Sequence, residues 1–300
     1  MKMKKLSVVL LSLLAAVMVL SGCGGGAQDN DSAESAENGA KNSDQAILVV
    51  SFGTSYNDSR DKTIGAIETA AAEAFPEYEV RRAFTSQIII DKLKERDNLE
   101  IDNVTEALDR AVADGIKTLI VQPTHLMNGY EYTDLKEELE TYRDKFEKIA
   151  LGEPLLTSEE DFRAVASETS SYDDGKTAIC FMGHGTEADS NQVYTKMQQT
   201  LAAMGKDAYY IGTVEAEPTL EDVMAAMKDK GYSRVVLEPL MVVAGDHANN
   251  DMAGDEEDSW KSQLQASGYE VECVLKGLGE FEGIQDIYTD HIRAAVDSLS

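Results

Sequence analysis

Three residues that could bind a divalent metal follow three successive apolar segments of the chain. His184 lies in CFMGHGTE, Glu215 in YIGTVEAEPT and His247 in EPLMVVAGDHANND. The spacings are 31 and 32 residues, each about the length of one strand and one helix. Because ligands of open parallel α/β sheets bind at the carboxyl ends of the strands, we expect the three side chains to meet at one sheet edge. Two imidazoles and a carboxylate suit Co²⁺, Fe²⁺, Ni²⁺ or Zn²⁺ and leave coordination positions open.

Each member of this set also has a structural interpretation. His184 stands between two glycines, which indicates a tight turn that another group approaches closely rather than a packed core position. His247 could instead orient its own loop. Glu217 is a second acidic candidate beside Glu215, and either carboxylate could simply be solvated near a helix start. Among the other histidines, we expect His291 on the last helix to lie at the surface.

The elements that must position these residues alternate between strands and helices. Val- and Ile-rich runs that are apolar throughout predict buried parallel strands, and the segments between them have apolar residues at helical spacing. Strands are predicted at Ile47–Phe52, Glu79–Phe84, Thr118–Gln122, Thr177–Met182, Ala208–Thr213, Arg234–Glu238 and Glu270–Leu275. Helices are predicted at Asp58–Phe75, Val104–Ala113, Gln192–Met204, Leu220–Lys228 and Ser259–Gln265. The sequence therefore predicts an α/β fold with parallel sheets covered on both faces.

Two internal similarities divide the body of the chain into halves. ILVVSFGTS resembles AICFMGHGT, and IKTLIVQPTHLMNG resembles YSRVVLEPLMVVAGD. Such pairs are typical of a duplicated strand-helix unit, although chance similarity between parallel strands is the alternative. We expect a first half over residues 46–172 and a second half over residues 173–300 that carries the metal site.

The charge of the chain narrows its range of partners. There are 27 Lys and Arg against 55 Asp and Glu, which gives a formal charge of -28. A surface this acidic repels phosphate groups, which argues against nucleic-acid binding. The 3 cysteines form no Cys-x-x-Cys motif, so neither a thiolate metal site nor a disulfide framework is expected.

The N-terminus is typical of an exported lipoprotein. Three lysines precede an apolar run from Leu6 to Leu20, which is shorter than the roughly 20 residues that span a bilayer. The sequence LSGC, ending at Cys23, resembles a bacterial lipobox, in which the cysteine is lipidated and becomes the first mature residue. We therefore expect a signal peptide over 1–22, a lipidated and flexible tether over 23–45, and an extracytoplasmic protein held to the bacterial membrane by lipid.

A family resemblance is carried by five motifs in chain order: VVSFGTS, PTHLMNGYEY, MGHGTEADSNQVY, GTVEAEPTL and PLMVVAGDHANNDMAGD. These motifs resemble the anaerobic cobalt chelatases of cobalamin biosynthesis, the sirohydrochlorin cobaltochelatases, which are class II chelatases of the ferrochelatase superfamily. The resemblance implies two flavodoxin-like α/β halves with a tetrapyrrole in a cleft between them. It also implies a metal site of His, Glu and His, which by motif are His184, Glu215 and His247.

The resemblance further implies insertion of Co²⁺, or Fe²⁺, into sirohydrochlorin or a related tetrapyrrole, with no organic cofactor. His184 would be both a metal ligand and the acceptor of pyrrole protons, because an imidazole titrates near neutral pH. Glu215 and His247 would hold the metal and assist proton removal.

A tetrapyrrole with eight carboxylates needs basic partners in this acidic protein. Arg81 and Arg82 on the second predicted strand are candidates, as are Arg60 and Lys62 at the start of the first long helix. Solvated surface charge is the alternative for all four. His125, which follows a strand of the first half, is a further substrate-binding candidate.

Two other functions share this outline. A solute-binding lipoprotein of a metal or heme importer is also a tethered pair of α/β lobes, but its ligands would come from both lobes. A chelatase-derived carrier would bind the metal or the tetrapyrrole without turnover. Homo-oligomerisation and an importer partner stay open, as does the substrate that an exported chelatase would meet outside the cytoplasm.

Overall fold

The computed structural model describes residues 44–168 and 174–300. The predicted signal peptide, the predicted lipidation at Cys23 and almost all of the predicted tether lie outside the described residues. Among the described helices, none is both long enough and apolar enough to cross a membrane.

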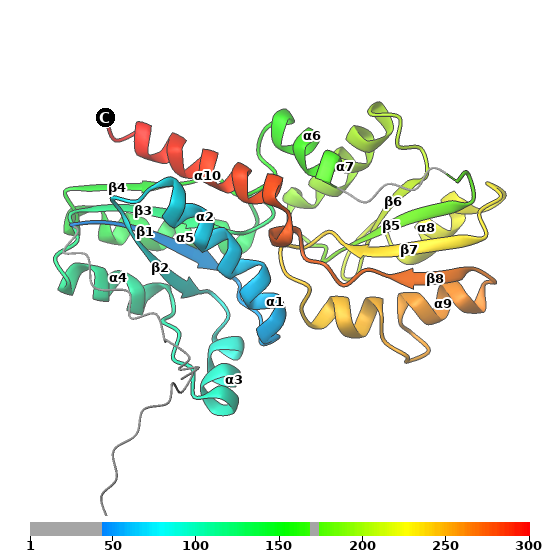
Figure 1. Ribbon diagram of the computed structural model, residues 1–300, viewed down its shortest axis with the longest axis horizontal. Helices are drawn as coiled ribbons and strands as arrows, with labels where there is room; N and C mark the ends of the chain where they lie inside the picture. Colours follow the sequence, from blue (N-terminus) through cyan, green and yellow to red (C-terminus); the bar gives the residue numbers. More distant parts are fainter. Residues whose placement is uncertain (1–43, 169–173) are drawn as a thin grey trace, which may run out of the picture. The chain divides into compact units, whose positions relative to one another are not determined.

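Two parallel sheets of four strands each form the framework of the described chain (Figure 1). The first has the order β2-β1-β3-β4 and the second the order β6-β5-β7-β8. The strands are β1 (Gln45–Ser51), β2 (Glu79–Phe84), β3 (Thr118–Pro123), β4 (Lys148–Leu151), β5 (Thr177–Gly183), β6 (Tyr209–Thr213), β7 (Arg234–Pro239) and β8 (Glu270–Cys273). The predicted α/β fold is confirmed, and the matching strand orders place β5 where β1 lies, as the internal similarity indicates.

Helices connect the strands, as parallel pairing requires. They are α1 (Asn57–Lys62), α2 (Ile64–Ala74), α3 (Gln87–Asp97), α4 (Val104–Ala113), α5 (Tyr130–Tyr142), α6 (Glu159–Glu168), α7 (Gln192–Ala203), α8 (Leu220–Met227), α9 (Trp260–Ala266) and α10 (Glu282–Asp297). The prediction of a single helix over 58–75 is wrong, because two helices occupy this segment. It is divided at Thr63, whose hydroxyl donates to the Ser59 carbonyl oxygen at 2.6 Å.

Two helices pack on the half to which they do not belong in sequence. α6 contacts α7 of the second half, and α10 runs back over α2 and β3 of the first half (Figure 1). One apolar core therefore contains residues of both halves, among them Ile67 and Phe181. The hydroxyl of Tyr288 on α10 also donates to the Thr124 carbonyl oxygen at 2.8 Å.

The register of the second sheet brings the carboxyl ends of its strands level. Gly183 at the end of β5 pairs with Thr213 at the end of β6. On the other side of β5, Met182 pairs with Pro239, the last residue of β7. Side chains in the three loops that follow these strands can therefore meet at one edge.

Candidate metal centre

The structure brings His184, Glu215 and His247 together at this edge. One ligand atom from each side chain lies within 4.8 Å of the others. The two imidazole rings meet edge to face, with centroids 4.7 Å apart and planes at 83°. His184 and Glu215 are exposed and His247 is half-buried, so the cluster is open to an incoming metal.

His184 owes its position to the two glycines around it. A Cβ at Gly183 would lie 2.2 Å from the ring of Tyr194, and one at Gly185, where φ is +87°, would lie 2.8 Å from the backbone nitrogen of Ala216. Only glycine therefore lets the chain turn this tightly against its neighbours. Nδ1 of His184 lies 2.8 Å from the Gly185 carbonyl oxygen, an acceptor only, so Nδ1 carries the proton and Nε2 holds the free lone pair.

Glu215 is tied to His184 through the backbone. The Glu215 N–H donates to the His184 carbonyl oxygen at 2.9 Å, which continues the pairing of β5 and β6 beyond the strands. The turn is closed by the Thr213 hydroxyl, which donates to the Ala216 carbonyl oxygen at 2.5 Å. The competing Glu217 is not a member of the cluster.

His247 reaches the same point from a longer loop. It precedes a short π-helix, η3 (Ala248–Met252), whose Ala248 and Met252 are fully buried in the core of the second half. Nδ1 of His247 lies 2.6 Å from Oδ2 of Asp251, four residues later. This carboxylate accepts a hydrogen bond from Nδ1–H, which leaves Nε2 free to face the cluster.

The three side chains together form a ligand set with chemistry suited to borderline divalent metals. Each histidine presents Nε2, because Nδ1 is already hydrogen bonded, and Glu215 adds one negative charge. Three protein ligands leave coordination positions free for water or for the nitrogens of a second ligand.

The structure does not place His125 in this cluster. It follows β3, and both of its ring nitrogens are shielded from solvent with no hydrogen-bond partner among the described residues. Burial lowers the pKa of His125 to about 4, and nearby Glu131 only partly offsets this. His125 is therefore neutral at pH 7, with an unused donor and an unused acceptor.

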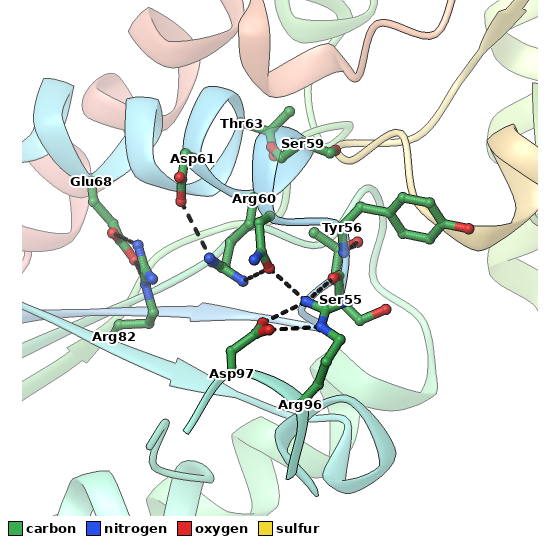
Figure 2. Close-up of polar contacts among 12 residues, drawn as sticks. Ser55, Tyr56, Ser59, Arg60, Asp61, Thr63, Glu68, Arg82, Arg96 and Asp97 are labelled. Carbon is green, nitrogen blue, oxygen red and sulfur yellow. Dashed lines mark hydrogen bonds and ion pairs between the residues drawn. The ribbon is translucent and has the colours of Figure 1, made fainter. Parts of the chain in front are cut away.

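The basic candidates are paired with acids of the first half. Arg81 makes two hydrogen bonds to the Glu79 carboxylate, at 3.0 and 3.1 Å, and an ion pair with Asp114 at 2.8 Å. Arg82 is bound through two nitrogens to the carboxylate of Glu68 (Figure 2). The charges of both arginines are thus already compensated, and their role in substrate binding stays a prediction.

The prediction that His291 lies at the surface is wrong. Its side chain is only 14% exposed, with Nε2 3.4 Å from Asp161 and Nδ1 3.1 Å from the Glu153 carbonyl oxygen. The physical reason is that α10 lies against α6 and the first sheet, so the residues on this face of the helix are covered.

Sequence reasoning missed Asp251 and Tyr194. Asp251 follows His247 by four residues, the spacing at which side chains meet on one turn of helix, and this signal could have found it. Tyr194 packs against the turn at His184, and its hydroxyl accepts a hydrogen bond from the Gly185 N–H at 3.2 Å. Because this contact depends on how α7 packs against the end of β5, no local sequence pattern indicates it.

The cleft expected beside the metal cluster stays a prediction. A groove of about 470 Å³ lies along α2, and one of about 900 Å³ lies along α6 and α7. Neither groove is lined by a member of the His, Glu and His cluster.

Comparison with known proteins decides the family. Residues 45–297 match the model of the cobalt chelatase family CbiK. The chain belongs to this family. It is 37% identical over 257 residues to a sirohydrochlorin cobaltochelatase of Salmonella typhimurium, and the matched region covers 84% of this chain and 97% of the relative. A sirohydrochlorin cobaltochelatase of Nitratidesulfovibrio vulgaris is 35% identical over 264 residues, covering 85% and 92%.

Solved structures support the chelatase fold. SirB from Bacillus subtilis with Fe³⁺ has a TM-score of 0.60 at 17% sequence identity, covering 85% of this chain and 96% of SirB. The cobalt complex of the sirohydrochlorin chelatase SirB from Bacillus subtilis subspecies spizizenii has a TM-score of 0.58 at 15% identity, with the same coverage. The family model and the two relatives confirm the family resemblance of the motifs, and the SirB structures confirm the chelatase-like fold of two halves.

Proposed function

We propose that this cobalt chelatase family member inserts Co²⁺ into sirohydrochlorin, and that His184, Glu215 and His247 bind the metal. The proposal is carried by one observation: three residues separated by 31 and 32 positions present their ligand atoms within 4.8 Å. Its relatives of 35% and 37% identity are sirohydrochlorin cobaltochelatases, which supports sirohydrochlorin as the macrocycle.

The ligand set accounts for both requirements of the reaction. A metal enters a tetrapyrrole only when two pyrrole N–H protons leave, so the site must hold the metal and accept protons. Open coordination positions let the ring nitrogens replace water one at a time. The exposed His184 is the proposed first proton acceptor, with Glu215 and His247 retaining the metal and assisting deprotonation.

We include His125 as a substrate contact. Its two buried ring nitrogens have no partner in the described residues, and an unsatisfied buried polar group destabilises the free protein. A hydrogen bond to the bound tetrapyrrole would remove this penalty. Fe²⁺ is a second proposed substrate metal, because imidazole and carboxylate ligands suit it as well as Co²⁺.

The test is Co²⁺ insertion into sirohydrochlorin, followed by the shift of its visible absorption bands. Wild-type protein should exceed the spontaneous rate, whereas His184→Ala, His247→Ala and Glu215→Gln should each lose most of the acceleration. Glu217→Gln is the matched control, since this neighbour lies outside the cluster, and it should keep the wild-type rate. Protein that binds the ring without accelerating insertion would favour the carrier and overturn the proposal. Repeating the assay with Fe²⁺ tests the second metal.

We also propose that the protein works outside the cytoplasm, held to the bacterial membrane by lipid on Cys23. The basis is the run of lysines, apolar residues and LSGC at the N-terminus. Labelled fatty acid should be incorporated into the wild-type protein in cells and not into Cys23→Ala. Equal labelling of both, or a soluble wild-type protein, would contradict this location.

A further inference from the structure

The loop that carries His247 is held by the other half of the molecule. His247 lies eight residues beyond Pro239, the end of β7, whereas His184 directly follows β5. Within this loop, Val243 packs against a cluster of the first half composed of Ile64, Phe84, Ile90 and Leu93. The position of His247 therefore depends on more than its own sheet.

Polar contacts continue this attachment toward the histidine. The buried Ala244 donates its N–H to Oγ of Ser59 at 3.0 Å. The Tyr56 hydroxyl donates to Oδ1 of Asp246, the residue before His247, at 3.4 Å. Between these two contacts, a Cβ at Gly245 would lie 3.2 Å from Oγ1 of Thr54, so the two segments of the chain approach closely.

The first-half segment that makes these contacts is itself anchored (Figure 2). The Arg96 guanidinium on α3 donates to the Ser55 carbonyl oxygen and to Oδ1 of Asn57, both at 2.7 Å. Arg60 donates to the same Asn57 oxygen at 2.9 Å. In Figure 2 the Tyr56 ring points away from these arginines, toward the gold ribbon of the second half. The network therefore fixes one side of the segment and leaves the other side to hold the loop.

We propose that Ser59 and Tyr56 are positioning residues for His247. Their side chains hydrogen bond to the Ala244 N–H and to the Asp246 carboxylate, and so hold the loop on which this ligand is carried. This inference rests on the proposed metal-binding role of His247. It makes the metal centre a property of both halves, although all three ligands belong to the second.

A double-mutant cycle tests the proposal. Co²⁺ alone is titrated into the full chain, and bound Co²⁺ is followed by its visible absorption. Ser59→Ala should weaken Co²⁺ binding about tenfold, as loss of a group that orients a ligand does. Ser59→Thr, which keeps the hydroxyl, should restore the affinity. In a His247→Ala background, Ser59→Ala should change the affinity no further, because the ligand that it positions is gone.

Ser158→Ala is the matched control. Oγ of Ser158 also accepts a hydrogen bond from a backbone N–H, that of Asp161 at 3.1 Å, but Ser158 directly precedes α6 and does not belong to the segment that holds the loop. It should leave Co²⁺ affinity unchanged. If Ser59→Ala does not yield folded protein, Tyr56→Phe provides the same cycle with a smaller expected loss.

The outcomes separate the two proposals. Equal losses in the wild-type and His247→Ala backgrounds, or an equal loss in Ser158→Ala, would show general loosening and overturn the positioning role. Full affinity in Ser59→Ala would overturn it as well. A wild-type protein that does not bind Co²⁺ would overturn the proposed function itself, and the positioning role with it.

Discussion

The carboxylate of Asp251 is linked to the proposed metal centre through His247. Its Oδ2 lies 2.6 Å from Nδ1 of the histidine, so it selects the tautomer whose Nε2 can bind a metal. We predict that Asp251→Asn weakens Co²⁺ binding by at least about tenfold. Titration with Co²⁺ measures this loss.

Asp255→Asn serves as the comparison for Asp251→Asn. Asp255 is also an acid of the same region, but it is 96% exposed and pairs only with Lys261 in the described contacts. It should bind Co²⁺ as tightly as wild type. Equal affinities of the two variants would show that the hydrogen bond from His247 to Asp251 does not contribute to Co²⁺ binding.

The lowered pKa of His125 should make the free energy of unfolding depend on pH. Its pKa is lowered from 6.5 to about 4 by burial, so the unfolded chain takes up this proton at a higher pH than the folded protein. Folding is therefore favoured at pH 7 and loses up to about 3 kcal/mol from this residue as the pH falls from 6.5 to 4. We predict that His125→Gln has a shallower decline in unfolding free energy over this window, measured by urea denaturation. Parallel curves for wild type and variant would contradict it.

At the scale of elements, the end of β5 and helix α7 hold each other in place. A Cβ at Gly183 would lie 2.2 Å from the ring of Tyr194, which is 1% exposed and packed in the core. We predict that Gly183→Ala lowers the unfolding free energy by about 1–3 kcal/mol and weakens Co²⁺ binding, because His184 follows directly. Urea denaturation and Co²⁺ titration measure the two effects.

Gly205→Ala separates this clash from ordinary backbone strain. Gly205 lies two residues beyond the end of α7 with φ at +75°, and nothing lies within 4 Å of a Cβ there. It should cost only about 1–2 kcal/mol of conformational strain and leave Co²⁺ affinity unchanged. Wild-type affinity in Gly183→Ala would mean that the turn tolerates a displaced Tyr194.

The elements that carry the proposed metal ligands were predictable because burial on both faces leaves continuous apolar runs. β5 and β7 are buried along almost their whole length, and their predicted ranges differ from the structure by one residue. β4 was not predicted, because this four-residue strand is half-exposed and lacks such a run. α3 and α5 were missed because their many charged residues obscure the helical period.

The candidate site was predictable to the extent that strand order determines it. His184 and Glu215 stand within two residues of strand ends, so topology alone brings them to one edge. The support of His247 was not predictable, because the contact of Ser59 with Ala244 joins positions 185 residues apart. Such contacts depend on packing between halves, which leaves no periodic signal in a single sequence.

At the scale of the whole molecule, the shared core argues against independent halves. Ile67 of α2 and Phe181 of β5 belong to one cluster, and α10 carries residues of the second half into the first. A core common to both halves should make unfolding cooperative, since neither half can keep its apolar residues buried alone. The consequence can be measured because the chain has 1 tryptophan, Trp260, which is buried in the second half.

We predict that urea unfolding gives the same midpoint by Trp260 fluorescence and by far-ultraviolet circular dichroism. Ile67→Ala in the first half should shift both midpoints together, because a cavity at this fully buried position costs about 2–5 kcal/mol. Ile88→Ala removes the same atoms from a residue of the first half that is 79% exposed, and it should change stability by less than about 0.5 kcal/mol. A fluorescence transition that stays in place while the dichroism splits into two phases would mean that the halves unfold separately, and the shared core would then contribute little to stability.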